Sequence, residues 1–88
     1  MKLKIRKDLA FRRIAGELFI VDAAKAEMHE LNGTAALIWE GLAAGKTEKS
    51  IISSITEEFE INDDTARADL EAFLEEMLKA GLVCSEGL

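Results

Sequence analysis

The sequence predicts an α+β fold in which a three-stranded antiparallel meander is followed by three helices. Two observations support this. Short segments rich in β-branched and aromatic residues are confined to the region before Asn32, and apolar residues recur at helical spacing after it. The 88 residues suffice for one domain with a modest core, and no linker, repeat or low-complexity stretch divides them. We therefore expect a single domain, residues 1–88, whose helices cover one face of the sheet.

Three short segments before Asn32 have strand character, namely residues 11–15, 18–22 and 26–31. The middle segment is the clearest, because it is rich in β-branched and aromatic residues and Gly16 marks a turn before it. Residues 22–25 would form the second turn, although their alanines also fit a short helical turn. The third segment alternates only imperfectly between apolar and polar residues. The order of these segments indicates an antiparallel meander.

Helical spacing begins directly after Asn32. The side-chain oxygen of Asn32 is expected to accept a hydrogen bond from an unpaired amide of the first turn. This residue would thus cap a helix that runs to about Ala44 and stops at Gly45. Trp39 lies among apolar residues at helical spacing. We interpret it as a core residue, with a binding role as the alternative.

Two further helices are predicted in the rest of the chain. Thr47 should cap the first of them, and Asn62 or Asp63 should cap the second, where acidic residues face the positive end of the helix dipole. Residues 79–82 combine a cation, a glycine and an apolar residue, a pattern typical of a helix C-terminus. The apolar residues that follow are expected to pack under the core.

The charge of the chain is negative overall and unevenly distributed. The net charge of −6 and the pI near 4.7 argue against nucleic-acid binding, which requires a basic surface. Residues 1–13 nevertheless hold six basic side chains against one acid, whereas the rest of the chain holds five basic and sixteen acidic residues. We interpret the basic segment as an N-terminal arm, residues 1–10, that lies over an acidic body. The alternative is a basic patch that binds an acidic partner.

Neither a membrane-spanning segment nor a secretion signal is expected. The apolar runs are four or five residues long, far short of the ~20 residues that cross a bilayer. No apolar region follows the basic N-terminus, as a signal peptide would require. The single cysteine, Cys84, has no internal partner for a disulfide. These features predict a cytoplasmic protein that does not bind a membrane.

The inventory of reactive side chains is small. His29 is the only histidine and Cys84 the only cysteine, so neither a zinc site nor a Cys–His pair is predicted. Residues 41–47 lack the glycine spacing of a phosphate-binding loop. The carboxylates of the third helix are best interpreted as solvated surface. We therefore expect no catalytic residue, no metal and no cofactor, and hence a protein that is not an enzyme.

Residues 28–40, Met-His-Glu-Leu-Asn-Gly-Thr-Ala-Ala-Leu-Ile-Trp-Glu, resemble the His-x-Leu-Asn-x-Thr-Ala signature of the PqqD-like proteins, peptide chaperones also called RiPP recognition elements. Residues 45–51 resemble the Gly-x-Thr-x-x-x-Ile turn that opens the second helix of the family, and residues 68–77 resemble its third helix. Residues 39–45 depart from the family, which often has Leu-Asp-Gly before this turn. The resemblance extends over residues 11–83 and implies a winged-helix-like fold.

The resemblance also implies a function. Proteins of this family bind the leader segment of a ribosomally synthesised precursor peptide and present it to a modifying enzyme, often a radical SAM enzyme. The leader adds along the third strand and lies in a groove between this strand and the third helix, a mode that an exposed strand edge permits. The implied peptide-binding residues are Ala26, Glu27, Met28, His29, Glu30 and Leu31 on the strand, and Arg67, Leu70, Glu71 and Leu74 on the third helix.

These assignments and the function itself have alternatives. Arg67 is the favoured residue of the third helix, since it could hold a leader carboxylate in a bidentate manner, whereas core packing would equally explain the two leucines. Glu27 and Glu30 would discourage the strand from pairing with itself. A DNA-binding winged helix is disfavoured, because the third helix carries six acids against two cations. A structural or dimerisation module without a peptide ligand is the other interpretation, and both a monomer and a homodimer are compatible with the sequence.

Overall fold

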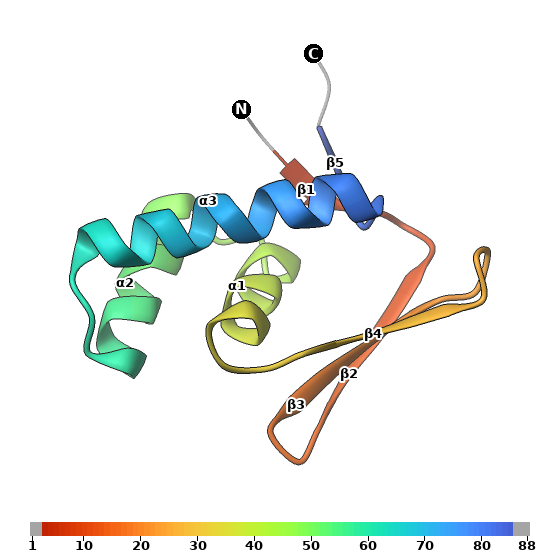
Figure 1. The fold of residues 1–88 in the computed structure, drawn as a ribbon, viewed down its shortest axis with the longest axis horizontal. Coiled ribbons are helices and arrows are strands. Elements are labelled where there is room, and N and C mark those ends of the chain that lie inside the picture. The colour runs from red at the N-terminus through yellow and green to blue at the C-terminus, as the bar shows by residue number, and fades with distance from the viewer. Residues whose placement is uncertain (1–2, 86–88) are drawn as a thin grey trace.

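A computed structural model describes residues 3–85, in which a twisted three-stranded antiparallel sheet packs against three helices (Figure 1). The sheet contains β2 (Leu9–Ile14), β3 (Glu17–Asp22) and β4 (Glu27–Leu31) in that order, so that β3 is central. The helices that follow are α1 (Gly33–Ala43), α2 (Glu48–Phe59) and α3 (Asp63–Ala80). The predicted α+β fold, a meander followed by three helices, is confirmed.

A second, two-stranded sheet that the sequence did not predict joins the two ends of the described chain. β1 (Leu3–Ile5) pairs antiparallel with β5 (Val83–Ser85) beside the C-terminal end of α3 (Figure 1). The region that we interpreted as a basic arm therefore contains a strand. Residues 1 and 2 of that arm, like residues 86–88, lie outside the described residues. A three-residue strand gives little local signal, because its partner comes from the opposite end of the sequence.

The core lies between the inner face of the sheet and the helices. Leu18 and Ile20 of β3 are buried there, together with Trp39 of α1 and Leu70 of α3. The ring of Trp39 is fully buried and meets the ring of Phe11 edge-on, with the ring centroids 5.7 Å apart. The interpretation of Trp39 as a core residue is therefore confirmed.

An exposed ion pair ties the outer strand β2 to α1. Arg13 donates from Nε and Nη2 to the two carboxylate oxygens of Glu40, at 2.8 and 2.6 Å. The hydrogen bond from Arg13 lowers the pKa of the Glu40 carboxyl. Because the two side chains are 41 % and 38 % exposed, the pair contributes only modestly to stability.

The helix caps differ from the prediction at one position. Asn32 precedes α1, but its side chain accepts no hydrogen bond from the first turn, so the predicted cap is wrong. The reason lies in Gly33, whose φ of +55° turns the backbone between Asn32 and the helix. The other two predicted caps are confirmed: Thr47 Oγ1 accepts from the Ser50 amide at 3.1 Å, and Asn62 Oδ1 accepts from an α3 amide at 2.8 Å.

Replacing each asparagine by alanine should separate a cap from a residue that merely precedes a helix. Asn62→Ala is expected to lower the free energy of unfolding by about 1 kcal/mol, because a first-turn amide of α3 loses its acceptor. Asn32→Ala is expected to cost less than half as much, since no such bond is lost. Urea denaturation of both variants measures the difference, and equal losses would contradict the absence of a cap at Asn32.

Candidate functional site

The outer edge of β4 is the first part of the candidate site. β4 pairs with β3 on one side only, and within residues 3–85 no strand pairs with its other side. A strand edge of this kind presents a row of backbone N–H and C=O groups that have no partner in the sheet. Such a row can accept an additional strand from another chain.

The register identifies which residues of β4 present these groups. The hairpin between β2 and β3 closes at the pair Ile14 and Glu17 through two residues with positive φ, the geometry of a type I′ turn. The pair that closes such a turn is hydrogen-bonded, and bonded and non-bonded pairs then alternate along the ladder. The residues of β3 that are not bonded to β2 direct their backbone groups to β4, where they pair with Glu27, His29 and Leu31. The backbone groups of these three residues therefore point towards β3. The backbone groups of Met28 and Glu30 therefore point away from it, along the open edge.

The side chains of β4 divide between the two faces of the sheet. Met28 is 67 % exposed on the outer face, together with Glu30, whereas Leu31 is buried on the inner face. His29 is half-buried on the inner face, with Nε2 at 3.5 Å from a carboxylate oxygen of Glu27 and without a hydrogen-bond partner among residues 3–85. The preceding residue, Ala26, has a φ of +54° and belongs to the turn instead of the strand.

A groove lies between the end of β4, α1 and α3. Its volume is about 380 Å³, and Leu31, Thr34, Ala35 and Ile38 line one side. The other side consists of five residues of α3: Asp69, Ala72, Phe73, Glu76 and Met77. The buried residues make its floor apolar, while Asp69 and Glu76 place two carboxylates on its α3 wall. The structure thus combines an open strand edge with an apolar groove that is flanked by acids.

The α3 residues that the sequence pointed to do not form this groove. Leu70 is 1 % exposed and belongs to the core, and Leu74 is half-buried against it. Arg67 lines a different hollow, between α2 and α3, beside Glu48. Since residues three and four apart share one side of a helix, the exposed Glu71 lies on the same flank as Arg67 and Leu74.

The groove thus lies along the opposite flank of α3 from the residues that we expected to form its wall. The sequence shows which stripe of α3 is apolar, and this stripe is indeed the buried one. It does not show which flank of the stripe turns towards β4, because this depends on how α1 and α2 pack beneath α3. Asp69 and Glu76 were interpreted as ordinary solvated surface for the same reason.

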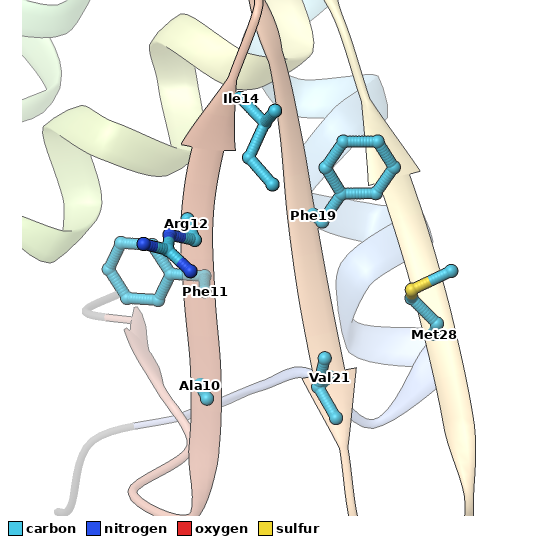
Figure 2. A pocket seen from close by; sticks show the side chains of 7 residues that line it. All are labelled: Ala10, Phe11, Arg12, Ile14, Phe19, Val21 and Met28. Carbon is cyan, nitrogen blue, oxygen red and sulfur yellow. The ribbon is translucent and has the colours of Figure 1, made fainter.

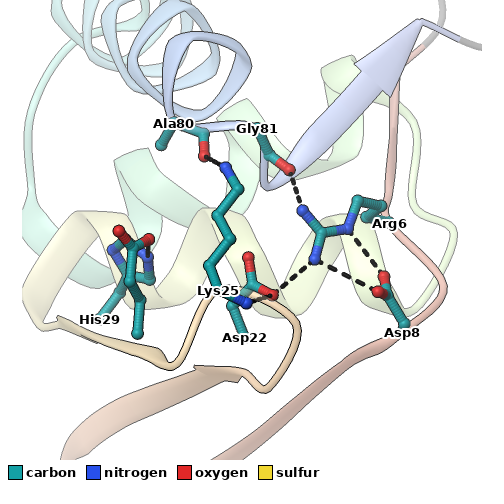
Figure 3. Close-up of polar contacts among 8 residues, drawn as sticks. Arg6, Asp8, Asp22, Lys25, His29, Ala80 and Gly81 are labelled. Carbon is teal, nitrogen blue, oxygen red and sulfur yellow. Dashed lines mark hydrogen bonds and ion pairs between the residues drawn. The ribbon is translucent and has the colours of Figure 1, made fainter.

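A polar network that the sequence analysis missed holds the base of the sheet against the end of α3 (Figure 3). The side chain of Asp22 is fully buried, and its Oδ1 accepts from Arg6 Nη2 at 2.7 Å. Arg6 also donates to a carboxylate oxygen of Asp8 at 2.7 Å and to the carbonyl oxygen of Gly81 at 2.9 Å. Lys25, in the turn before β4, donates from Nζ to the carbonyl oxygen of Ala80 at 3.4 Å.

This network links β3, the turn before β4 and the C-terminus of α3. The hydrogen bond from Arg6 lowers the pKa of Asp22, and the same donor lowers the pKa of Asp8. Arg6 is separated in the sequence by 16 residues from Asp22 and by 75 from Gly81, so no local motif predicts these two contacts. The network thereby connects the turn before β4 to the C-terminal end of α3.

Within residues 3–85, no group of three or more His, Cys, Asp or Glu side chains is placed to hold a metal ion. Nor does any helix of this part of the chain have the length and apolar character that crossing a membrane requires.

Comparison with known proteins gives one family and two similar structures. The model of the family described as coenzyme PQQ synthesis protein D (PqqD) matches residues 17–83. The structure of TbiB1 in complex with the TbiA(β) leader peptide is 25 % identical, with a TM-score of 0.85, and the match covers 97 % of this chain and 96 % of that one. A lasso peptide synthetase B1 complexed with the leader peptide is 22 % identical, with a TM-score of 0.86, and the coverage is 97 % and 100 %. Among curated proteins, none matches this sequence significantly.

Proposed function

The chain belongs to the PqqD family, and on this basis we propose that it binds the leader segment of a ribosomally synthesised precursor peptide and presents it to a modifying enzyme. The observation that carries the proposal is the open edge of β4 beside an apolar groove. Two proteins of similar structure, one of them 25 % identical, are described as complexes with leader peptides. The chain has the role of a binding protein in this proposal, and the chemical step belongs to the enzyme.

The leader binds by strand addition. Its backbone pairs with the outward N–H and C=O groups of Met28 and Glu30, which extends the sheet by one strand. Alternate side chains of an added strand point to the inner face. There they enter the groove above Ile38, Phe73 and Met77, where an apolar side chain is removed from water. Backbone pairing thus supplies affinity, and the groove selects the side chains.

The groove favours a leader that carries a cation beside its apolar anchor. Asp69 and Glu76 line its α3 wall, and within the described residues no arginine or lysine lines it. Arg67, the residue that could have held a leader carboxylate, lies in the hollow between α2 and α3. A lysine or arginine of the leader would therefore be attracted to the α3 wall, whereas an acidic side chain at the same place would be repelled.

Charge reversal on the two flanks of α3 tests this placement. Asp69→Lys is expected to weaken the binding of a leader with a basic anchor region by about tenfold, because an attraction becomes a repulsion. Arg67→Glu is the matched control on the opposite flank and should change affinity less than twofold. Fluorescence anisotropy of a labelled leader measures the dissociation constants of both variants. A larger effect of Arg67→Glu would contradict the groove assignment.

The partner enzyme is proposed to be the one encoded beside the precursor. The family resemblance favours a radical SAM enzyme, and a cytoplasmic setting suits such a partnership. The leader half of the precursor encoded nearby should bind in a saturable manner, and the chain should stimulate modification of the full precursor by the enzyme. Absence of binding to any such leader by folded protein would overturn the proposal.

A further inference from the structure

The face of the sheet that points away from the helices is apolar and exposed (Figure 2). Ile14, Val21 and Met28 are 51 %, 43 % and 67 % exposed, and the half-buried Phe19 lies among them. The helices lie behind the sheet in this view, so that they cover only the inner face. Exposed apolar patches of roughly a few hundred Å² often serve as interaction surfaces.

The strand register arranges this outer face in rows. Arg12, Phe19 and Glu30 are cross-strand neighbours and form the central row, with the cation on β2 and the acid on β4. Ala10, Val21 and Met28 form the next row, with the small residue on β2 and the large one on β4. Charge and side-chain size are therefore both distributed unequally about β3.

We propose that this outer face is the contact between two copies of the chain, related by a two-fold axis that runs along β3. Such an axis exchanges β2 and β4 across the interface, as in other isologous contacts. Arg12 of each copy then faces Glu30 of the other, and Ala10 of each copy faces the long side chain of Met28. Phe19 meets its own copy at the axis. The face is thus complementary to itself in charge and in volume.

The charges of the face lack partners within one copy. The side chain of Arg12 is exposed on β2, and among residues 3–85 it takes part in no ion pair and no side-chain hydrogen bond. Glu30 instead adjoins a second acid, Glu17, and the closeness of the two carboxyl groups raises the pKa of Glu17. A guanidinium from a second copy would neutralise this pair of acids. Glu17 lies on β3 and would also approach its own copy, which opposes association.

The area of the face predicts a weak dimer. With strands of six, six and five residues, at about 3.4 Å per residue and about 4.8 Å between strands, the face measures roughly 20 by 15 Å. Two such faces bury less than the roughly 1,600 Å² of a standard interface. Association is therefore expected at micromolar or higher concentrations. The contact leaves the outer edge of β4 free, so it does not depend on the proposed peptide function.

Sedimentation equilibrium of the full chain, from about 5 to 500 µM, tests the proposal. The wild-type protein should show a reversible monomer–dimer equilibrium. Arg12→Glu and Glu30→Arg should each weaken it at least about tenfold through like-charge contacts, and the double variant should restore it to within a few-fold of wild type. Glu17→Gln should strengthen it, since it removes the repulsion at the axis. Circular dichroism verifies that each variant is folded.

The results that would overturn the dimer are equally distinct. A monomer across the whole concentration range contradicts it, as does a double variant that remains as weak as the single ones. Protection of Met28 and Phe19 from solvent only when the modifying enzyme is added would assign the face to that enzyme instead. Arg67 lies outside this face, so the Arg67→Glu variant should leave the monomer–dimer equilibrium unchanged.

Discussion

Replacing Arg6 by methionine is expected to lower the melting temperature by roughly 10 °C, because a buried carboxylate loses its charge partner. Arg6 supplies the charge partner of Asp22, whose side chain is fully buried. Without the guanidinium, Asp22 must either remain charged in the interior or take up a proton, and both alternatives destabilise the folded state. The variant also frees the carbonyl oxygen of Gly81, at the end of α3.

Arg13→Met is the matched control for this prediction. Arg13 also contacts a carboxylate in a bidentate manner, but that carboxylate, Glu40, is 38 % exposed and water replaces the lost partner. Its melting temperature should fall by only a few degrees. Thermal denaturation followed by circular dichroism measures both variants. Equal losses would contradict the account, because they would mean that burial of Asp22 does not matter.

The same network predicts how stability depends on pH. The folded state lowers the pKa of Asp22 and of Asp8 below the ordinary value of 3.8. The stabilisation from these groups is therefore complete above about pH 4 and is lost as the pH falls through their lowered values. Because Arg6 is the main cause of both shifts, Arg6→Met should be less sensitive to acid in this range than the wild-type protein.

Replacing Met28 by proline is expected to abolish leader binding while the protein remains folded. The Met28 amide points along the open edge of β4, so proline removes a donor that the leader needs and that β3 does not use. A ring at this position also obstructs the approach of an added strand. We expect a loss of affinity of at least about a hundredfold, measured by fluorescence anisotropy of a labelled leader.

Met28→Ala separates the backbone from the side chain at this position. Alanine keeps the outward amide and removes the long side chain, which lies on the outer face and away from the groove. Its affinity for the leader should therefore stay within a few-fold of wild type. A folded Met28→Pro variant that binds the leader normally would place the peptide elsewhere on the molecule.

The order of the main elements could be predicted because each has a local pattern. The aromatic and β-branched residues around Phe19 define a strand, and the apolar spacing in α3 defines a helix whose cap at Asn62 is visible in the sequence. The pair β1 and β5 could not be predicted, since each strand is three residues long and depends on the other. The cap at Asn32 failed because the positive φ of Gly33 follows from the backbone path between sheet and helix.

The candidate site could be predicted in part. The strand that presents the open edge followed from the family resemblance, and the structure adds which amides face outwards. The flank of α3 that lines the groove required the packing of three helices, so that Arg67 was favoured where Asp69 and Glu76 lie. The link between Arg6 and Asp22 depends on tertiary structure alone, because the chain brings together residues of β3 and of the segment before β2.

The most direct test is an amide-resolved NMR titration of the labelled protein with the leader half of the precursor encoded beside its gene. We expect saturable shifts at the outward amides of Met28 and Glu30 and along the groove wall at Asp69, Ala72 and Glu76, with little change at Arg67. Saturable shifts confined to the hollow between α2 and α3, or no shifts in a folded protein, would contradict strand addition at β4.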